Sequence, residues 1–240
     1  MTNYQRVLDT ELAKLAAAGV RPRLLLHACC APCSSYTLEY LAAYFDITVL
    51  FYNPNIAPAA EYDFRAAELA RYIAEAPCGA GVKLRVEPYD PAPFFEMAKG
   101  LEDLPECGER CKKCYRLRLR ETARIAAAEG FDYFCTTLSI SPHKDAGALN
   151  AIGGELATAC GVPYLFSDFK KKGGYLKSIE LSGIYDLYRQ DYCGCEFSYA
   201  RSIVLSHEYG LYRQNYCGCV YSKRAAEKRE AEHEQHSGLS

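Results

Sequence analysis

The sequence predicts an α/β domain built on a parallel sheet, and two features of the chain lead to this expectation. Short apolar runs that suit buried strands alternate with amphipathic stretches of roughly 10 to 18 residues. At 240 residues, the chain is also long enough for one sizeable domain or two small ones. Because strands that alternate with helices favour βαβ units with right-handed crossovers, we expect a Rossmann-like parallel sheet.

The expected elements follow one another along the first two thirds of the chain. Residues 2–18 place Val7, Leu12 and Leu15 at helical spacing, and Gly19 ends this helix. A buried strand begins at Leu24. The other expected strands cover residues 47–52, 82–87, 131–136 and 164–166, and the other expected helices cover residues 34–44, 59–76, 94–99, 115–129 and 145–160. Residues 105–114 and 138–144 are expected to be loops.

Beyond residue 174 the chain contains a segment that occurs twice. Residues 175–198 and 199–222 align without gaps, and 15 of the 24 positions are identical. Two copies are too few for a solenoid, so a local tandem duplication of one helix and turn is the simpler interpretation. We expect an α/β catalytic domain at residues 1–174, with the duplicated helix-turn segment at 175–222 packed on it. The charged composition of residues 223–240 predicts a disordered tail.

Composition narrows the class of protein. The formal net charge is −2, so a nucleic-acid partner must be held by a local basic patch. Residues 1–23 lack the apolar core of a signal peptide, and no run approaches the length of a membrane span. We therefore expect a cytoplasmic protein. In that compartment, 13 cysteines favour metal binding or redox work over structural disulfides.

Two groups of cysteines suit a metal centre. Cys29, Cys30 and Cys33 directly follow the first strand, and the carboxyl ends of parallel strands form the ligand crevice of such sheets. Cys111 and Cys114 form a Cys-x-x-Cys at the entry to a helix, where the helix dipole favours thiolate. Four thiolates suit a [4Fe–4S] cluster. Zinc also accepts four thiolates, and buried cysteines can simply pack, so both alternatives stay open.

A third group is the Cys-Gly-Cys at Cys193 and Cys195, which the duplication repeats at Cys217 and Cys219. A disulfide between two cysteines separated by one residue would be strained and easily reduced, which indicates a redox-active pair. The alternative is that the two thiols form a second metal-binding pair. Four cysteines are expected outside the site: Cys135 and Cys160 in the core, and Cys78 and Cys107 in loops, with a spare ligand as the alternative for Cys107.

Basic and aromatic residues suggest a surface for RNA. Arg116, Arg120 and Arg124 form one stripe on a helix, and Lys170–Lys172 with Arg189 or Arg213 add positive charge. Tyrosines near these cations could stack on bases, although such stripes are often only solvated faces. These tyrosines are Tyr175, Tyr185, Tyr188 and Tyr192. His27 is expected to support the cysteines by hydrogen bonding, with a direct ligand role as the alternative.

Five motifs in order resemble the QueH type of epoxyqueuosine reductase over roughly residues 20–198. They are His27–Pro32, Glu109–Leu119, Thr136–Lys144, Phe169–Lys171 and Tyr188–Cys195. The resemblance implies reduction of epoxyqueuosine to queuosine at the wobble position of tRNA, the final step of queuosine biosynthesis. It also implies a fold of the adenine-nucleotide-hydrolase (HUP) type. The sequence leaves the electron donor unidentified.

Matched by motif, Cys29, Cys30, Cys111 and Cys114 correspond to the cluster ligands, and Cys193 with Cys195 to the redox-active pair. Cys33 falls where the family allows Cys or Asp, either of which could hold an additional mononuclear iron. Cys107 stands where glycine is more typical, and the second Cys-Gly-Cys is not needed by the family pattern. The copy at 193 and 195 is favoured because it keeps its distance along the chain from the Phe-Lys-Lys motif.

The mechanism that the resemblance suggests combines a reduced cluster with an iron that binds the epoxide oxygen, while the dithiol stores electrons. Asp145, His143 and Tyr192 are all candidate proton donors. Two other functions compete with this one. An ATP-pyrophosphatase-like tRNA sulfur transferase needs a Ser-Gly-Gly-x-Asp-Ser loop, but Cys29–Pro32 stands there. A zinc-stabilised RNA-binding protein would use its thiols only for shape.

Overall fold

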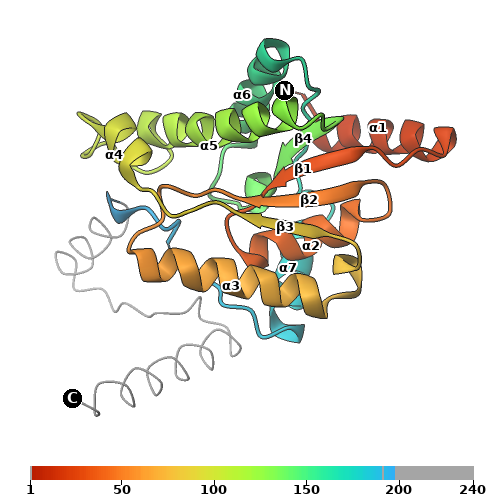
Figure 1. The fold of residues 1–240 in the computed structure, drawn as a ribbon, viewed down its shortest axis with the longest axis horizontal. Helices are drawn as coiled ribbons and strands as arrows, with labels where there is room; N and C mark the ends of the chain where they lie inside the picture. Colours follow the sequence, from red (N-terminus) through yellow and green to blue (C-terminus); the bar gives the residue numbers. More distant parts are fainter. Residues whose placement is uncertain (1, 191, 198–240) are drawn as a thin grey trace.

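A computed structural model describes residues 2–190 and 192–197 of the chain. Its centre is a four-stranded parallel sheet with strand order β3-β2-β1-β4, shown in Figure 1. The strands are β1 (Arg23–His27), β2 (Asp46–Phe51), β3 (Lys83–Val86) and β4 (Tyr133–Thr136). In the central pairs, Leu25 lies opposite Thr48 of β2 and Phe134 of β4. The predicted α/β class with a parallel sheet is confirmed.

Helices cover both faces of this sheet. The α-helices are α1 (Tyr4–Ala18), α2 (Ala31–Leu41), α3 (Ala59–Glu75), α4 (Ala92–Ala98), α5 (Glu109–Ala128), α6 (Ala146–Cys160) and α7 (Gly174–Ile184), and the two 3₁₀ turns are η1 (Pro77–Gly79) and η2 (Thr137–Ile140). In Figure 1, α5 and α6 lie on one side of the sheet, and α2, α3 and α7 lie on the other. α7 packs against α2.

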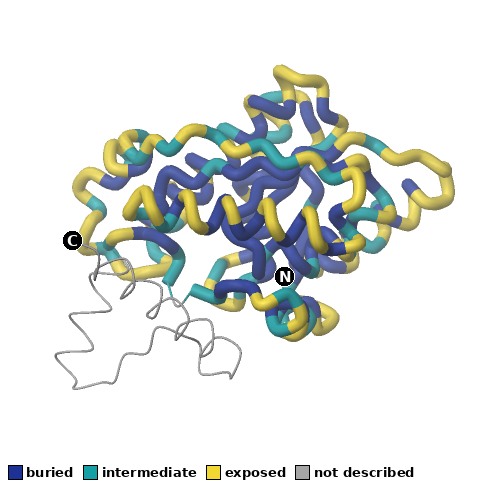
Figure 2. Tube along the Cα trace, turned by 60° about the horizontal axis from the view of Figure 1, so that its bottom comes forward, coloured by how far each residue is buried: buried dark blue, intermediate teal, exposed yellow. Residues whose placement is uncertain are grey.

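The core has two halves because successive strand residues point to opposite faces. Leu24 and Leu26 of β1 pack with α1, α2 and α3, whereas Leu25 packs with α5 and α6. All three leucines are fully buried, and Figure 2 shows the strands as the buried centre of the molecule. A strand covered on both faces needs apolar residues at every position, which explains the Leu-Leu-Leu run.

Several predicted boundaries were wrong, including that of the helix expected at residues 34–44, which is α2 and begins at Ala31, before Cys33. α5 begins at Glu109 rather than at residue 115, with Gly108 at its N-cap and Glu109 favourably placed in the first turn. Residues 138–140, expected in a polar loop, belong to the buried 3₁₀ turn Thr137–Ile140. The fifth strand expected at residues 164–166 is a single parallel bridge between Tyr164 and Phe134, in which only Phe134 exchanges backbone hydrogen bonds, with Pro163 and Leu165.

The first copy of the duplicated segment packs on the α/β domain. α7 covers α2, and residues 185–190 and 192–195 then run along α3, as their hydrogen bonds show. The second copy and the predicted tail at 223–240 lie outside the described residues. Among the described helices, none is both long and apolar enough to cross a bilayer.

Candidate metal and redox site

The first thiol group lies at the carboxyl end of β1. Cys30 is the N-cap of α2, and Pro32 suits the first turn of that helix because it has no N–H to satisfy. The Sγ atoms of Cys29, Cys30 and Cys33 lie within 4.8 Å of one another, and the Cys29 and Cys30 sulfurs are 3.7 Å apart. Tetrahedral thiolate ligands about 2.3 Å from one ion have this spacing. These three residues could hold a metal.

The electrostatics of this group favour one shared negative charge. Hydrogen bonds from Cys30 and Cys33, with the charges of Lys144 and Arg118, hold the pKa of Cys29 well below its usual value. The same hydrogen bonds to Cys29, together with burial, raise the pKa of Cys33. A metal that binds here must displace the remaining thiol protons, so metal affinity will rise with pH.

The second group gathers around the amino end of α5. Cys111 and Cys114 lie in its first two turns, and they line a small cavity of about 30 Å³ together with Cys193 and Cys195. Burial raises the pKa of both Cys111 and Cys114. Cys114 and Cys195 are buried in one apolar cluster with Phe94. No disulfide joins any cysteines in the described part of the chain.

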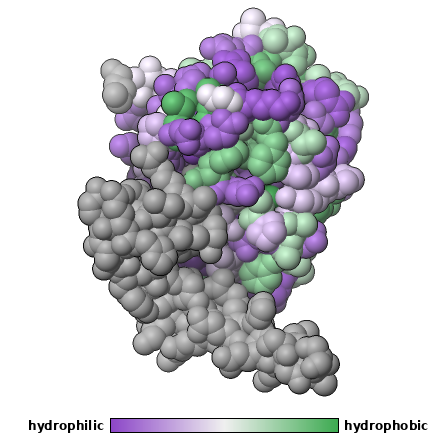
Figure 3. Space-filling view, turned by 90° about the vertical axis from the view of Figure 1, so that its left-hand side faces the viewer, coloured by the Kyte–Doolittle hydropathy of each residue, from purple (hydrophilic) through white to green (hydrophobic). Residues whose placement is uncertain are grey.

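A larger cavity of about 420 Å³ adjoins the small one. Cys29 and Cys33 line it on one side, and Tyr175, Arg189 and Tyr192 line it from the duplicated segment. Both cavities share the residues Glu106, Arg118, His143, Lys144 and Cys193. Figure 3 faces the end of the molecule that carries α4, where hydrophobic surface lies between hydrophilic side chains. The thiols of three chain segments therefore line one continuous hollow.

A buried chain of polar contacts ties the first two thiol groups together. Asn53 donates its side-chain amide to the carbonyl of Ala28 at 2.8 Å. Arg118 contacts the Asn53 amide oxygen at 3.5 Å and the Cys114 carbonyl at 3.4 Å. Arg118 is 3% exposed, and the Cys114 and Cys29 charges outweigh the effect of burial and raise its pKa. It is a permanent cation between the two groups.

The thiol-pair segment, residues 185–190 and 192–195, is clamped along α3. Arg71 donates to the carbonyls of Tyr185 and Asp186 at 3.0 and 3.2 Å. Glu68 accepts the backbone N–H of Tyr188. Because residues 68 and 71 recur on one face of the helix, α3 presents a continuous row of partners to this segment.

The clamp continues into the loop before α3. Ala57 exchanges two hydrogen bonds with the segment: its N–H donates to the Gly194 carbonyl at 3.0 Å, and its carbonyl accepts from the Tyr192 hydroxyl at 3.2 Å. Asn55 contacts the Cys193 carbonyl at 3.5 Å. Gly194 has φ +96°, a conformation that side chains disfavour, so glycine is required between the two cysteines.

His27 is buried and uses both ring nitrogens in hydrogen bonds, so it supports the site rather than offering a metal ligand. Its Nε2 must donate to the carbonyl of Tyr52 at 3.1 Å, so its Nδ1 accepts from the Thr136 hydroxyl at 2.9 Å. Burial and the charge of Arg118 lower its pKa to about 3, which keeps the ring neutral. Both ring nitrogens are thus engaged, and the supporting role predicted for His27 is the one that the structure favours.

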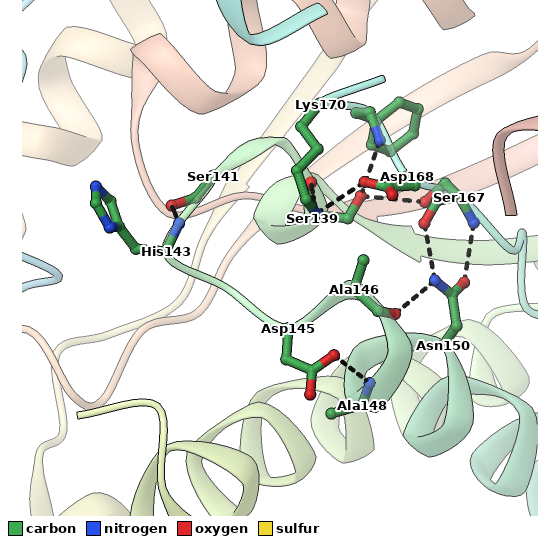
Figure 4. A network of polar contacts seen from close by, with 11 residues as sticks. Ser139, Ser141, His143, Asp145, Ala146, Ala148, Asn150, Ser167, Asp168 and Lys170 are labelled. Carbon is green, nitrogen blue, oxygen red and sulfur yellow. Dashed lines mark hydrogen bonds and ion pairs between the residues drawn. The ribbon is translucent and has the colours of Figure 1, made fainter. Parts of the chain in front are cut away.

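The loop after β4 is held by a second network, drawn in Figure 4. Asn150 bonds both backbone groups of Ser167 at 2.8 and 2.9 Å, and Lys170 donates to the Ser139 carbonyl at 3.2 Å. His143 points away from this network (Figure 4) and lines both cavities. Asp145, a predicted proton donor, is instead the N-cap of α6.

The remaining cysteines have separate environments. Cys135 is fully buried, as predicted for a core thiol. Cys160 is only half-buried at the end of α6, and Cys78 sits in η1 with its sulfur 3.4 Å from the Tyr72 hydroxyl. Cys107 is exposed at φ +64°, in the left-handed region, a conformation that glycine adopts more easily than cysteine.

Much of the predicted basic surface is neutralised. Arg116 pairs with Glu155, and Arg124 with Glu121. Lys170 pairs with Asp168 and Lys172 with Asp9. Of the four tyrosines proposed for stacking, Tyr175 and Tyr192 line the larger cavity, whereas Tyr185 and Tyr188 pack on α3 against Tyr72 and Phe64. The cations and rings that reach the thiols are therefore those of the cavity.

Sequence reasoning did not assign site roles to Asn53, Arg65, Arg118 and Lys144. Arg118 and Arg65 carry a signal that could have been used, since each falls at a position of its helix otherwise occupied by buried residues. Lys144 is half-buried, and the charges of Cys29 and Cys193 outweigh burial and raise its pKa. Its one sequence signal is its place at the end of the Thr136–Lys144 motif, which did not indicate a role for it.

Comparison with known proteins agrees with these motifs. The family model described as Epoxyqueuosine reductase QueH matches residues 24–201, and it matches a second time over residues 198–225, where the repeat lies. Two relatives named Epoxyqueuosine reductase QueH are 44% identical to this chain: that of Streptococcus pyogenes serotype M1 over 82% of this chain and 78% of its own length, and that of Staphylococcus epidermidis over 82% and 84%. A protein of the same name from Thermotoga maritima is 33% identical over 73% of this chain and 89% of its own. The chain therefore belongs to the QueH family of epoxyqueuosine reductases.

Proposed function

We propose that this protein reduces epoxyqueuosine to queuosine at the wobble position of tRNA, in the cytoplasm. The observation that carries the proposal is the gathering of thiols from three chain segments around adjoining cavities at the carboxyl end of the sheet. This is where ligands of open α/β sheets bind. Relatives that carry the name of this reaction support the same activity.

The cofactor that we assign is a [4Fe–4S] cluster held by Cys29, Cys30, Cys111 and Cys114, with Cys33 holding an additional iron. Two features of the site fit such a group. Every donor is a thiol, the ligand that iron–sulfur clusters prefer. The surroundings supply compensating positive charge, because Lys144 and Arg118 both act on the thiols of Cys29 and Cys114. When bound, the cluster supplies electrons one at a time.

The dithiol of Cys193 and Cys195 completes the electron balance. Removal of the epoxide oxygen as water consumes two electrons and two protons, and oxidation of two thiols to one disulfide releases the same number of each. Cys193 lines both cavities, and its charge acts on the thiols of Cys111 and Cys114, so it lies between the substrate cavity and the α5 thiols. An external electron donor must then reduce the disulfide for the next turnover.

Other residues of the larger cavity bind substrate and carry protons. Its volume of about 420 Å³ falls within the range of small-ligand pockets, so it can take a single modified base. Tyr175 and Tyr192 offer rings for stacking, and Arg189 offers a cation. His143 and Lys144 line both cavities, and we assign proton delivery to these two.

The activity is tested by incubating epoxyqueuosine-containing tRNA with iron-loaded protein and a strong chemical reductant, without oxygen. Mass spectrometry of the nucleosides should show loss of one oxygen atom. Cys193→Ser and Cys195→Ser, made singly, should each abolish multiple turnover, with Cys78→Ser as the matched control. Full turnover by both variants would exclude an essential dithiol, and unchanged tRNA with the wild-type protein would refute the activity.

A further inference from the structure

Arg65 is a buried cation with no role in the proposed chemistry so far. Its side chain is 0% exposed, although removal of a charged group from water is costly when the charge is not fully paired. Its Nε donates to Glu61 at 2.7 Å. Neither Nη1 nor Nη2 has a hydrogen-bond partner among the described residues. Most of the N–H groups of this guanidinium are therefore unused.

The unused end of Arg65 lies against the Cys-Gly-Cys turn. Its guanidinium carbon lies 5.2 Å from the ring centre of Tyr192, directly before the Cys-Gly-Cys. A Cβ placed on Gly194 would lie 3.2 Å from Nη1, so this nitrogen packs against the turn between Cys193 and Cys195. The charge of Arg65 also acts on the Cys30 thiol. One cation thus lies against the proposed electron store and acts through its charge on a proposed cluster ligand.

We propose that Arg65 is a positioning residue that raises the reduction potential of the thiolate-bound cluster. This inference rests on the proposed function, because it requires that the cluster be bound. A cation near metal thiolates stabilises the reduced state, which carries one more negative charge, and N–H groups directed at sulfur act in the same direction. The orphaned nitrogens are suited to this task, because nothing else in the described chain uses them.

Glu61 sets the strength of this effect. Its carboxylate is 17% exposed and pairs with Nε, so it holds the guanidinium in place and cancels part of its charge. Loss of the Glu61 charge should therefore increase the effective positive potential at the thiols. Loss of the Arg65 charge should decrease it. Opposite signs from two residues in one ion pair distinguish electrostatic control from general loosening of the structure.

The test is a redox titration of the iron-loaded protein followed by visible absorbance, with iron and sulfide content measured for every variant. Arg65→Met should lower the ratio of reduced to oxidised cluster at fixed ambient potential at least tenfold, or about 59 mV for a one-electron couple. Arg65→Lys should retain most of the wild-type ratio. Glu61→Gln should shift the ratio in the opposite direction. Arg71→Met is the matched control, because Arg71 clamps the same segment at Tyr185 and Asp186; it should leave the ratio unchanged.

Unchanged ratios in both Arg65→Met and Glu61→Gln, at full iron content, would overturn the assignment. Shifts of the same sign in Glu61→Gln and Arg71→Met would also overturn it, because loosening alone would then suffice. If Arg65→Met binds no iron, the Glu61→Gln variant decides: a higher ratio of reduced to oxidised cluster supports the proposal, and an unchanged or lower ratio overturns it. A wild-type protein that stays colourless after reconstitution refutes the proposed cofactor and this inference with it. If the wild-type protein does not reduce the tRNA but the Arg65 and Glu61 variants still shift the cluster potential as expected, only the proposed reaction is refuted.

Discussion

Replacement of Gly194 by alanine should displace Cys193 and Cys195 from their packed position against α3 and the loop before it. The added Cβ would lie 2.8 Å from Cγ1 of Ile56 and 3.2 Å from Nη1 of Arg65, both closer than ordinary contact. At φ +96°, an L-residue also costs about 1–2 kcal/mol, and overpacking of a tight site costs about 1–3 kcal/mol. The docked arrangement should therefore lose roughly 2–5 kcal/mol, which lowers the ratio of docked to undocked segment by about 30-fold to several thousandfold.

The assay compares turnover of epoxyqueuosine-containing tRNA with the rate at which a maleimide labels Cys195, which is buried in the docked state. Gly194→Ala should reduce turnover at least tenfold and accelerate labelling. Gly161→Ala is the matched control, because Gly161 has φ +75° and no atom lies within 4 Å of the position that a Cβ would take there; it should cost stability but leave turnover and labelling unchanged. Wild-type turnover in Gly194→Ala would refute the requirement for this docked turn.

Three further outcomes are expected. The folded-state pKa of His27, about 3, lies below its unfolded value, so the unfolded chain binds more protons at acidic pH. The free energy of unfolding should therefore decrease as the pH falls below 6.5, by up to about 1.4 kcal/mol per pH unit. In urea unfolding, His27→Gln should flatten this pH dependence, and an unchanged slope would contradict the argument. Cys107→Gly should raise the free energy of unfolding by about 1 kcal/mol, because it relieves the left-handed φ of +64°, without changing iron content; a loss of iron would instead make Cys107 a ligand. Replacement of both Cys217 and Cys219 by serine should leave turnover intact, and a large loss would assign the redox role to the second copy.

The sequence was informative wherever one physical pattern governed a whole element. The parallel sheet followed from apolar runs such as Leu24–Leu26, since a strand covered on both faces must be continuously apolar. The position of Cys29 and Cys30 at a strand end followed from the same run. The start of α5 was misplaced because cysteines at 111 and 114 suggested a loop, although Glu, Arg and Lys beside them are good helix formers.

The polar surroundings of the thiols could not be read from local patterns. Asn53 and Arg118 are 65 residues apart, and they meet only because the carboxyl end of β2 and the amino-terminal half of α5 lie at the same side of the sheet. The prediction of a basic surface along α5 was only partly right, because Arg116 pairs with Glu155 on α6. Helical spacing within one segment does not reveal such a partner. Local sequence indicates which residues can carry charge, and packing decides which charges remain to act.

The most direct test is iron and sulfide analysis of anaerobically prepared protein, with Cys111→Ser and Cys114→Ser compared with Cys135→Ser. Cys29, Cys30 and Cys33 already lie within 4.8 Å of one another, so the participation of α5 is the decisive question. A cluster shared by both groups predicts a brown wild-type protein and loss of most iron in the two α5 variants, with Cys135→Ser unaffected. Full iron content in both α5 variants would show that the metal is held by the β1 thiols alone.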